Sequence, residues 1–345
     1  MSVLNASIPQ ERTGKTFQLS LFCAALAWSV AARYLSASSA EGITHRLHAD
    51  LLTPVLAVVF FLFLLAVGYS LLDVIARRPA ATSSILSLPV RPTALREWLL
   101  GAAIGWGIIV CTVLPMALTG SLQVGVWINS QAIIQLGVNL ALIGLLSLLQ
   151  EVIYRGYPFH RLIDAIGPVA ATIVMSLVFA FARVVQNDAP RSAAFLAFIA
   201  SIVFSIAWLR THALWLAWGM RFGWTASMGI LFGLPVSGST DLSTVIQTTT
   251  TGRNWLTGGD YGPEAAALFL LVAVTGGLIV LIRATRDYAW NYTHAAIIPG
   301  GFPMDVPPPK AHAAMEEAAQ SKPAALVQIL PSTPEGRSVE GPPQS

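Results

Sequence analysis

The chain has 345 residues, of which 55% are apolar and 11% are charged, and its formal net charge is +3. A soluble domain carries about 25% charged residues, so the charges here are too few to coat a soluble globule. Disorder of most of the chain is excluded as well, because disordered segments are poor in apolar residues. The apolar residues form continuous runs, not the alternating segments of about ten residues that a membrane barrel needs. The composition therefore predicts an all-α fold, a polytopic bundle of transmembrane helices.

Eight apolar runs have about the length that spans a bilayer as a helix. They cover residues 17–34, 51–75, 94–118, 131–157, 168–185, 192–209, 213–234 and 265–283. No charged residue lies between Glu97 and Glu151, so this stretch is expected to hold two spans joined by a polar turn near residues 120–130.

The first run has two interpretations. The small residues at positions 36–40 that follow it resemble a signal-peptide cleavage site. Arg33 and Tyr34 precede them and are typical of an interfacial stop. We favour an uncleaved anchor, and cleavage would leave seven spans in the same topology.

The charges in the loops predict the orientation, because cytoplasmic loops are rich in lysine and arginine. Arg77, Arg78 and Arg91 lie between the second and third runs, and Arg96 lies at the start of the third, so this loop and both termini are expected in the cytoplasm. The loop 235–264 has one basic residue, Arg253, and is expected outside. The basic residues form no patch, so no nucleic-acid partner is expected.

The chain is expected to have three parts. Residues 1–93 hold the first two spans and residues 94–290 form the membrane core. Residues 291–345 are rich in proline among alanine, glutamate, serine and glycine. Such a segment cannot bury a core, so it is expected to be a disordered cytoplasmic tail. Cys23 and Cys111 lie inside apolar runs and are interpreted as small apolar residues, with no disulfide framework.

Four ionisable residues stand out within the predicted spans, namely Glu151, Arg155, Arg183 and Arg221, whereas the other charges sit at span ends or in loops. Such residues are costly in a bilayer and indicate function by default. Glu151 and Arg155 are four positions apart, so they share a helix face and can form a pair, which would also serve to neutralise both charges. Arg183 lies near the end of its span, from which a long side chain can reach the interface. Arg221 is about 13 Å into its span at 1.5 Å per residue.

The sequence around these residues resembles the CPBP intramembrane proteases, which include the CAAX prenyl proteases and the Abi, or bacteriocin-processing, proteins. Residues 150–156 read Gln-Glu-Val-Ile-Tyr-Arg-Gly, similar to the family motif Glu-Glu-x-x-x-Arg-Gly. Residues 179–183, Phe-Ala-Phe-Ala-Arg, occupy the place of Phe-x-x-x-His. Residues 214–225, Leu-Trp-Leu-Ala-Trp-Gly-Met-Arg-Phe-Gly-Trp-Thr, occupy the surroundings of the third motif, His-x-x-x-Asn. The resemblance covers about residues 95–290, with all three motifs in order.

The resemblance implies hydrolysis of peptides inside the membrane. In that family the first glutamate and first histidine activate water, and the second pair binds a divalent metal such as zinc or orients the site. The asparagine helps to hold the oxyanion. Here the corresponding positions hold Gln150, Arg183, Arg221 and Thr225, and of the acidic residues only Glu151 remains. Glutamine cannot accept a proton from water, and arginine is neither a base nor a metal ligand. We therefore predict no metal and no other cofactor.

The six histidines of the chain offer few substitutes for the missing ligands. His45 and His48 have a spacing that a metal could use, but on a short outer loop. His160 and His212 lie at cytoplasmic ends, where they could approach each other and form a site with Glu151. We interpret both as interfacial residues.

Two hypotheses remain from the sequence. The protein is a pseudoprotease that binds or scaffolds a peptide, an anionic lipid or a partner membrane protein, or it is an active CAAX-type endopeptidase that uses unusual residues. Under either hypothesis it is an integral membrane protein in contact with the lipid bilayer, expected in the bacterial inner membrane. We further expect Glu151, Arg155, Arg183 and Arg221 to face one cavity, with Gln150 and Thr225 adding neutral hydrogen bonds.

Overall fold

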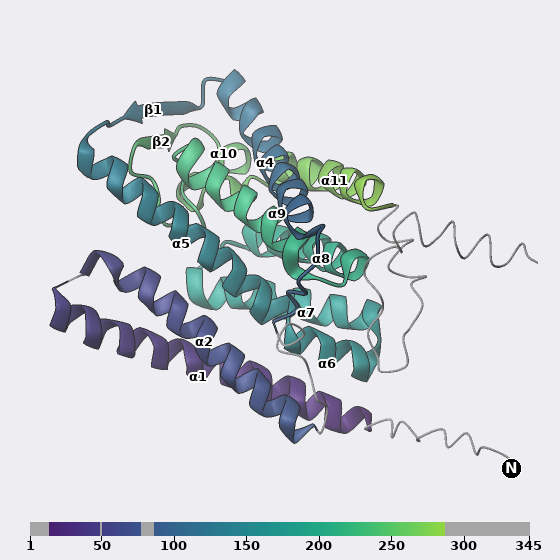
Figure 1. Ribbon diagram of the computed structural model, residues 1–345. Coiled ribbons are helices and arrows are strands. Elements are labelled where there is room, and N and C mark those ends of the chain that lie inside the picture. The colour runs from purple at the N-terminus through teal and green to yellow at the C-terminus, as the bar shows by residue number, and fades with distance from the viewer. Residues whose placement is uncertain (1–13, 49, 77–85, 287–345) are drawn as a thin grey trace, which may run out of the picture. The chain divides into compact units, whose positions relative to one another are not determined.

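The computed structural model describes residues 14–48, 50–76 and 86–286 (Figure 1). All described residues belong to one compact unit of the chain. The expected tail at 291–345 lies outside the described residues, as do Arg77 and Arg78.

The described residues contain seven helices that are long and apolar enough to cross a membrane. They are α1 (Lys15–Leu47), α2 (Thr53–Ile75), α4 (Ala94–Leu118), α5 (Ser130–Arg155) with its continuation α6 (Tyr157–Ile166), α7 (Pro168–Asn187), α8 (Arg191–Thr211) and α11 (Ala267–Ala284). The predicted all-α, polytopic membrane bundle is therefore confirmed.

The seventh predicted span, 213–234, forms two shorter pieces. Helix α9 covers Leu214–Ala226 and continues as a π-helical turn over Ser227–Leu231. Such π turns are rare and occur frequently at functional sites. The chain then leaves the helix at Gly233, whose φ of +61° favours glycine.

Helices α4 and α9 lie against each other with their backbones almost in contact (Figure 1). A Cβ atom on Gly105 would lie 2.0 Å from the carbonyl oxygen of Met220, and one on Gly219 would lie 2.0 Å from that of Trp98. Small residues such as glycine at a helix–helix contact allow the backbones of membrane helices to pack closely. The contact fixes the position of α9, and therefore of the arginine at position 221.

Three local features were not predicted. Helix α1 continues to Leu47, beyond Arg33 and Tyr34, and residues 36–40 lie inside it. The gap between the fourth and fifth predicted spans contains α6, which is separated from α5 at Gly156. The turn expected near 120–130 contains strand β1 (Leu122–Val126), which pairs antiparallel with β2 (Ile246–Thr250). Between β2 and α11 lie the short helical turns α10 (Asn254–Thr257), η3 (Gly259–Tyr261) and η4 (Pro263–Ala265).

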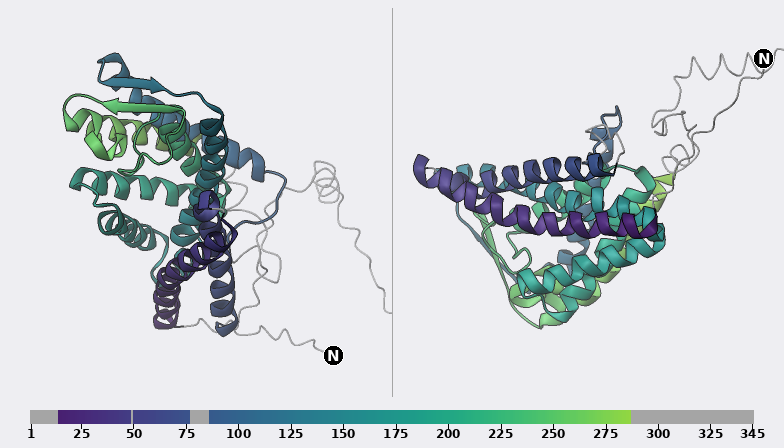
Figure 2. Two further views of the ribbon diagram at one scale, coloured as in Figure 1. Left: turned by 90° about the vertical axis from the view of Figure 1, so that its left-hand side faces the viewer. Right: turned by 90° about the horizontal axis from the view of Figure 1, so that it is seen from below.

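The core consists of two clusters of apolar side chains. The first cluster contains side chains of α4, α8, α9 and α11. The second contains side chains of α1, α2, α5, α6, α7 and α8. Figure 2 shows α1 and α2 side by side. Helix α5 contributes to the second cluster and also contacts α9, so its last two turns lie where the two clusters meet.

Candidate functional site

A fully buried carboxylate is the centre of the site. Glu151, in the last two turns of α5, has an exposed fraction of 0%. Its Oε1 accepts a hydrogen bond from Nη1 of Arg155 at 3.2 Å and another from Nε of Arg221 on α9. The spacing of four predicted the pair with Arg155. The pair with Arg221 depends on the packing of α5 against α9.

Arg155 is completely buried and bound on several sides. Its Nη2 donates to the carbonyl oxygen of Ser201 at 2.9 Å and to the Ser201 hydroxyl at 2.6 Å, both on α8. Its Nε lies 3.4 Å from the Ser205 hydroxyl. The face of the guanidinium lies 5.4 Å from the ring centre of Phe204. Arg155 therefore joins α5 to α8 in addition to neutralising Glu151.

Arg183 contacts a second carboxylate through a serine. Near the end of α7, its Nη1 donates to the hydroxyl of Ser237, which in turn lies 2.6 Å from Oε2 of Glu264. The indole N–H of Trp224 donates to Oε1 of Glu264 at 3.1 Å. The loop 235–264 thus folds back onto α7 and α9.

Tyr261 lies beside this network. Burial of its phenol, together with the nearby negative charge of Glu264, raises the pKa of Tyr261 above its usual value of 10.0, although Arg183 opposes this shift. The phenol therefore remains protonated at neutral pH and is a hydrogen-bond donor.

A cavity of about 30 Å³ lies among these groups, lined by Arg183, Arg221, Phe179, Tyr261 and Glu264 with apolar neighbours from α8. This is enough room for about one or two water molecules. Arg183 and Arg221 line the cavity as expected, whereas Glu151 and Arg155 are not part of its lining.

The two neutral motif positions do not join the cluster. Gln150 and Thr225 are both half-buried, and neither side chain forms a hydrogen bond with the described residues. Successive residues of a helix point about 100° apart, since 3.6 residues complete a turn. Gln150 therefore cannot share the direction of Glu151.

Sequence reasoning missed Glu264, which counted only as an acidic residue of an outer loop. It also missed two buried ion pairs, Arg161 with Asp73 and Arg91 with Glu97. Arg91 was interpreted as a loop charge, and Arg161 lies in the gap between the fourth and fifth predicted spans, yet their exposed fractions are 6% and 5%. The sequence offered one signal for the second ion pair: Arg91 and Glu97 are only six residues apart, on either side of the start of α4.

The histidines do not form a metal site with described residues. The rings of His160 and His212 both pack against Trp208, with centroids 4.5 and 5.6 Å from the centre of its ring. No group of three His, Cys, Asp or Glu side chains in the described part of the chain could hold a metal ion. The residues at the motif positions also do not fit the divalent metal that the resemblance implies, because Arg183 and Arg221 are permanent cations.

Comparison with known families supports the motif assignment. Residues 129–227 match the sequence model of the family described as type II CAAX prenyl endopeptidase Rce1-like. This segment runs from the start of α5 through α9 and contains all three motifs. The resemblance drawn from the motifs is therefore confirmed over this part of the chain. No curated protein and no solved structure matched the chain.

Proposed function

We propose that this membrane protein, with its Rce1-like segment at residues 129–227, is a catalytically degenerate pseudoprotease whose motif positions serve binding. The observation that carries the proposal is the environment of Glu151. Its buried carboxylate is the shared partner of two guanidinium groups, those of Arg155 and Arg221.

A carboxylate in this environment is a poor general base. A base must lie within hydrogen-bond reach of the water that it deprotonates. Oε1 of Glu151 is already occupied by both arginines. Arg221 and Arg183 cannot substitute as bases or metal ligands, because arginine keeps its proton in proteins.

Reversion to the family residues tests this proposal. The single variant Arg183→His should show no peptidase activity, because residues of one catalytic unit act jointly and not additively. The joint variant Gln150→Glu, Arg183→His, Arg221→His and Thr225→Asn is the one expected to gain activity, measured as cleavage of a fluorogenic peptide in detergent. The joint variant with Glu151→Ala added is its control. Activity in the single variant would contradict the proposal.

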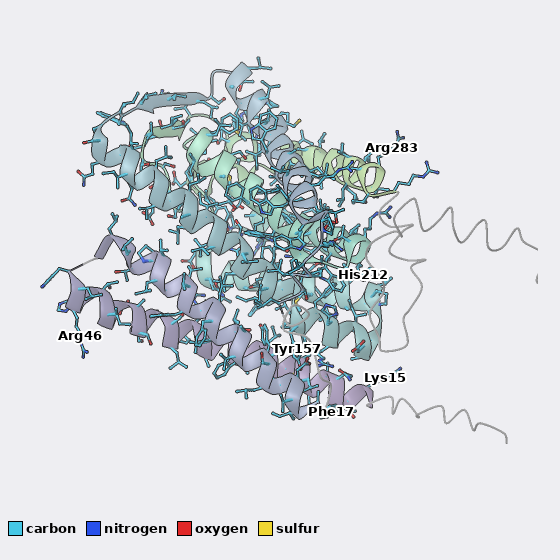
Figure 3. All side chains as sticks on the ribbon, viewed as in Figure 1. Lys15, Phe17, Arg46, Tyr157, His212 and Arg283 are labelled. Carbon is cyan, nitrogen blue, oxygen red and sulfur yellow. The ribbon has the colours of Figure 1, made fainter. Side chains whose placement is uncertain are left out.

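We also propose that both termini are cytoplasmic. Lys15 and Arg283 lie toward one end of the helices, and Arg46 lies toward the other (Figure 3). The orientation was predicted from the positive charges of the loop before α4. One of these charges, Arg91, is buried in an ion pair with Glu97, whereas Arg96 is exposed. A reporter fused after Arg286 should be cytoplasmic, and one inserted near Thr250 should be outside. Reversed labelling at both points would reject this orientation.

A further inference from the structure

Arg221 has an unused donor beside the cavity. Its guanidinium lies between two rings, with its carbon 4.4 Å from the ring centre of Phe204 and 5.0 Å from that of Phe179. Its Nε is bonded to Glu151, whereas its buried Nη2 has no hydrogen-bond partner among the described residues. The side chain as a whole is 6% exposed. A buried charged donor without a partner is costly and calls for an explanation such as a bound ion.

The charges around the cavity leave one positive charge in excess. Three guanidinium groups surround the ring of Phe179, at 5.7 Å for Arg155, 5.1 Å for Arg183 and 5.0 Å for Arg221. Two carboxylates contact this group of charges, Glu151 directly and Glu264 through Ser237. Three positive and two negative charges sum to +1, and an uncompensated charge in a weakly polar interior is unfavourable.

The shape of the cavity restricts what the ligand can be. Its small volume of about 30 Å³ favours a small anionic group at this position. Its wall is apolar on the α8 side, and the Tyr261 phenol is an additional donor. The oxygens of Glu264 are already satisfied by Ser237 and Trp224, so this acidic group need not contact a bound anion.

We propose that this cavity binds a small carboxylate anion, which accepts hydrogen bonds from Arg221 Nη2 and from Arg183. A planar carboxylate matches the geometry of a guanidinium edge, and its single negative charge balances the excess. The carboxylate belongs to a free small acid or to the end of a longer molecule. This inference deepens the proposed binding role and rests on it.

Thermal unfolding of the full-length protein in detergent tests the proposal. Sodium formate and sodium acetate are titrated as free acids, and N-acetylglycine as a carboxylate on a peptide-like chain. Sodium methanesulfonate, a monovalent tetrahedral anion, is the reference at equal ionic strength. A ligand that binds only the folded state stabilises it by RT ln(1 + [L]/Kd). Formate or acetate should therefore raise Tm in proportion to the logarithm of its concentration once that concentration exceeds Kd, and by more than methanesulfonate does. A response to N-acetylglycine as well would indicate an open cavity, and a response to the free acids alone a closed one.

Matched variants locate the effect. Arg221→Gln should raise at least tenfold the acetate concentration that gives the same increase in Tm, and the half-buried Arg183→Gln should do the same if the first variant fails to fold. Arg253→Gln, an exposed residue of the outer loop, makes the same change of charge and should respond like the unmodified protein. An unchanged Tm with formate and acetate, an equal increase with methanesulfonate, or an unchanged response in both cavity variants would overturn the proposal. Peptide cleavage by the unmodified chain would instead overturn the proposed function, and the two failures are therefore distinguishable.

Discussion

Replacement of Glu151 by glutamine is expected to lower the free energy of unfolding by about 3–5 kcal/mol, because removal of one member of a buried ion pair leaves an uncompensated charge. Here two guanidinium groups, those of Arg155 and Arg221, lose their shared partner. Glutamine has nearly the volume of glutamate, so the loss reports charge and hydrogen bonding with little contribution from packing.

A double-variant cycle separates this effect from general disruption. When Arg221→Gln is combined with Glu151→Gln, the total loss should be smaller than the sum of the two single losses, because contacting charges are coupled. Glu41→Gln, at an exposed position of α1, is the control and should change stability by less than about 0.5 kcal/mol. The measurement is equilibrium unfolding in mixed detergent. Additive losses would show that Glu151 and Arg221 do not act as a pair.

Replacement of Gly219 by alanine is expected to lower the free energy of unfolding by about 1–3 kcal/mol, the range for an overpacked interior. The added Cβ would lie 2.0 Å from the carbonyl oxygen of Trp98 and 3.0 Å from the amide nitrogen of Ala102. Both are backbone atoms, so α4 and α9 would have to separate. Arg221 lies two residues further along α9 and would move with it.

Gly107→Ala is the matched control on α4. Nothing lies within 4 Å of the position that its Cβ would take, and alanine favours a helix over glycine by about 1 kcal/mol. The same unfolding assay should therefore show unchanged or slightly higher stability for Gly107→Ala and a clear loss for Gly219→Ala. Equal behaviour of the two variants would contradict the close contact of α4 with α9.

The fold was predictable where hydrophobicity alone sets the boundaries. The apolar run at 94–118 coincides with α4, and the run at 51–75 nearly coincides with α2. The end of α1 was not predictable in this way, because its last turns carry polar and charged residues although they remain helical to Leu47. The pairing of β1 with β2 joins segments more than a hundred residues apart, and a local pattern has no information on such a contact.

The site divides in the same way. The pair of Glu151 with Arg155 follows from helical spacing within one segment, and the motifs indicated positions 183 and 221. The contact of Arg221 with Glu151 requires the packing of α5 on α9. The position of α9 is fixed in part by its close contact with α4 at four glycines, Gly101, Gly105, Gly219 and Gly223. Glu264 reaches the cavity only because the loop 235–264 folds back onto the helices. Its sequence neighbours, Pro263 and Ala265, gave no sign of this.

Peptidase activity of the unmodified full-length chain tests the central claim most directly. Purified protein and its Glu151→Ala variant are compared on prenylated and unprenylated peptide substrates, at matched folded concentration and with zinc supplied. If the two arginines occupy Glu151 as the contacts indicate, the two proteins should cleave at the same background rate. Robust cleavage by the unmodified chain that Glu151→Ala abolishes would contradict the pseudoprotease proposal.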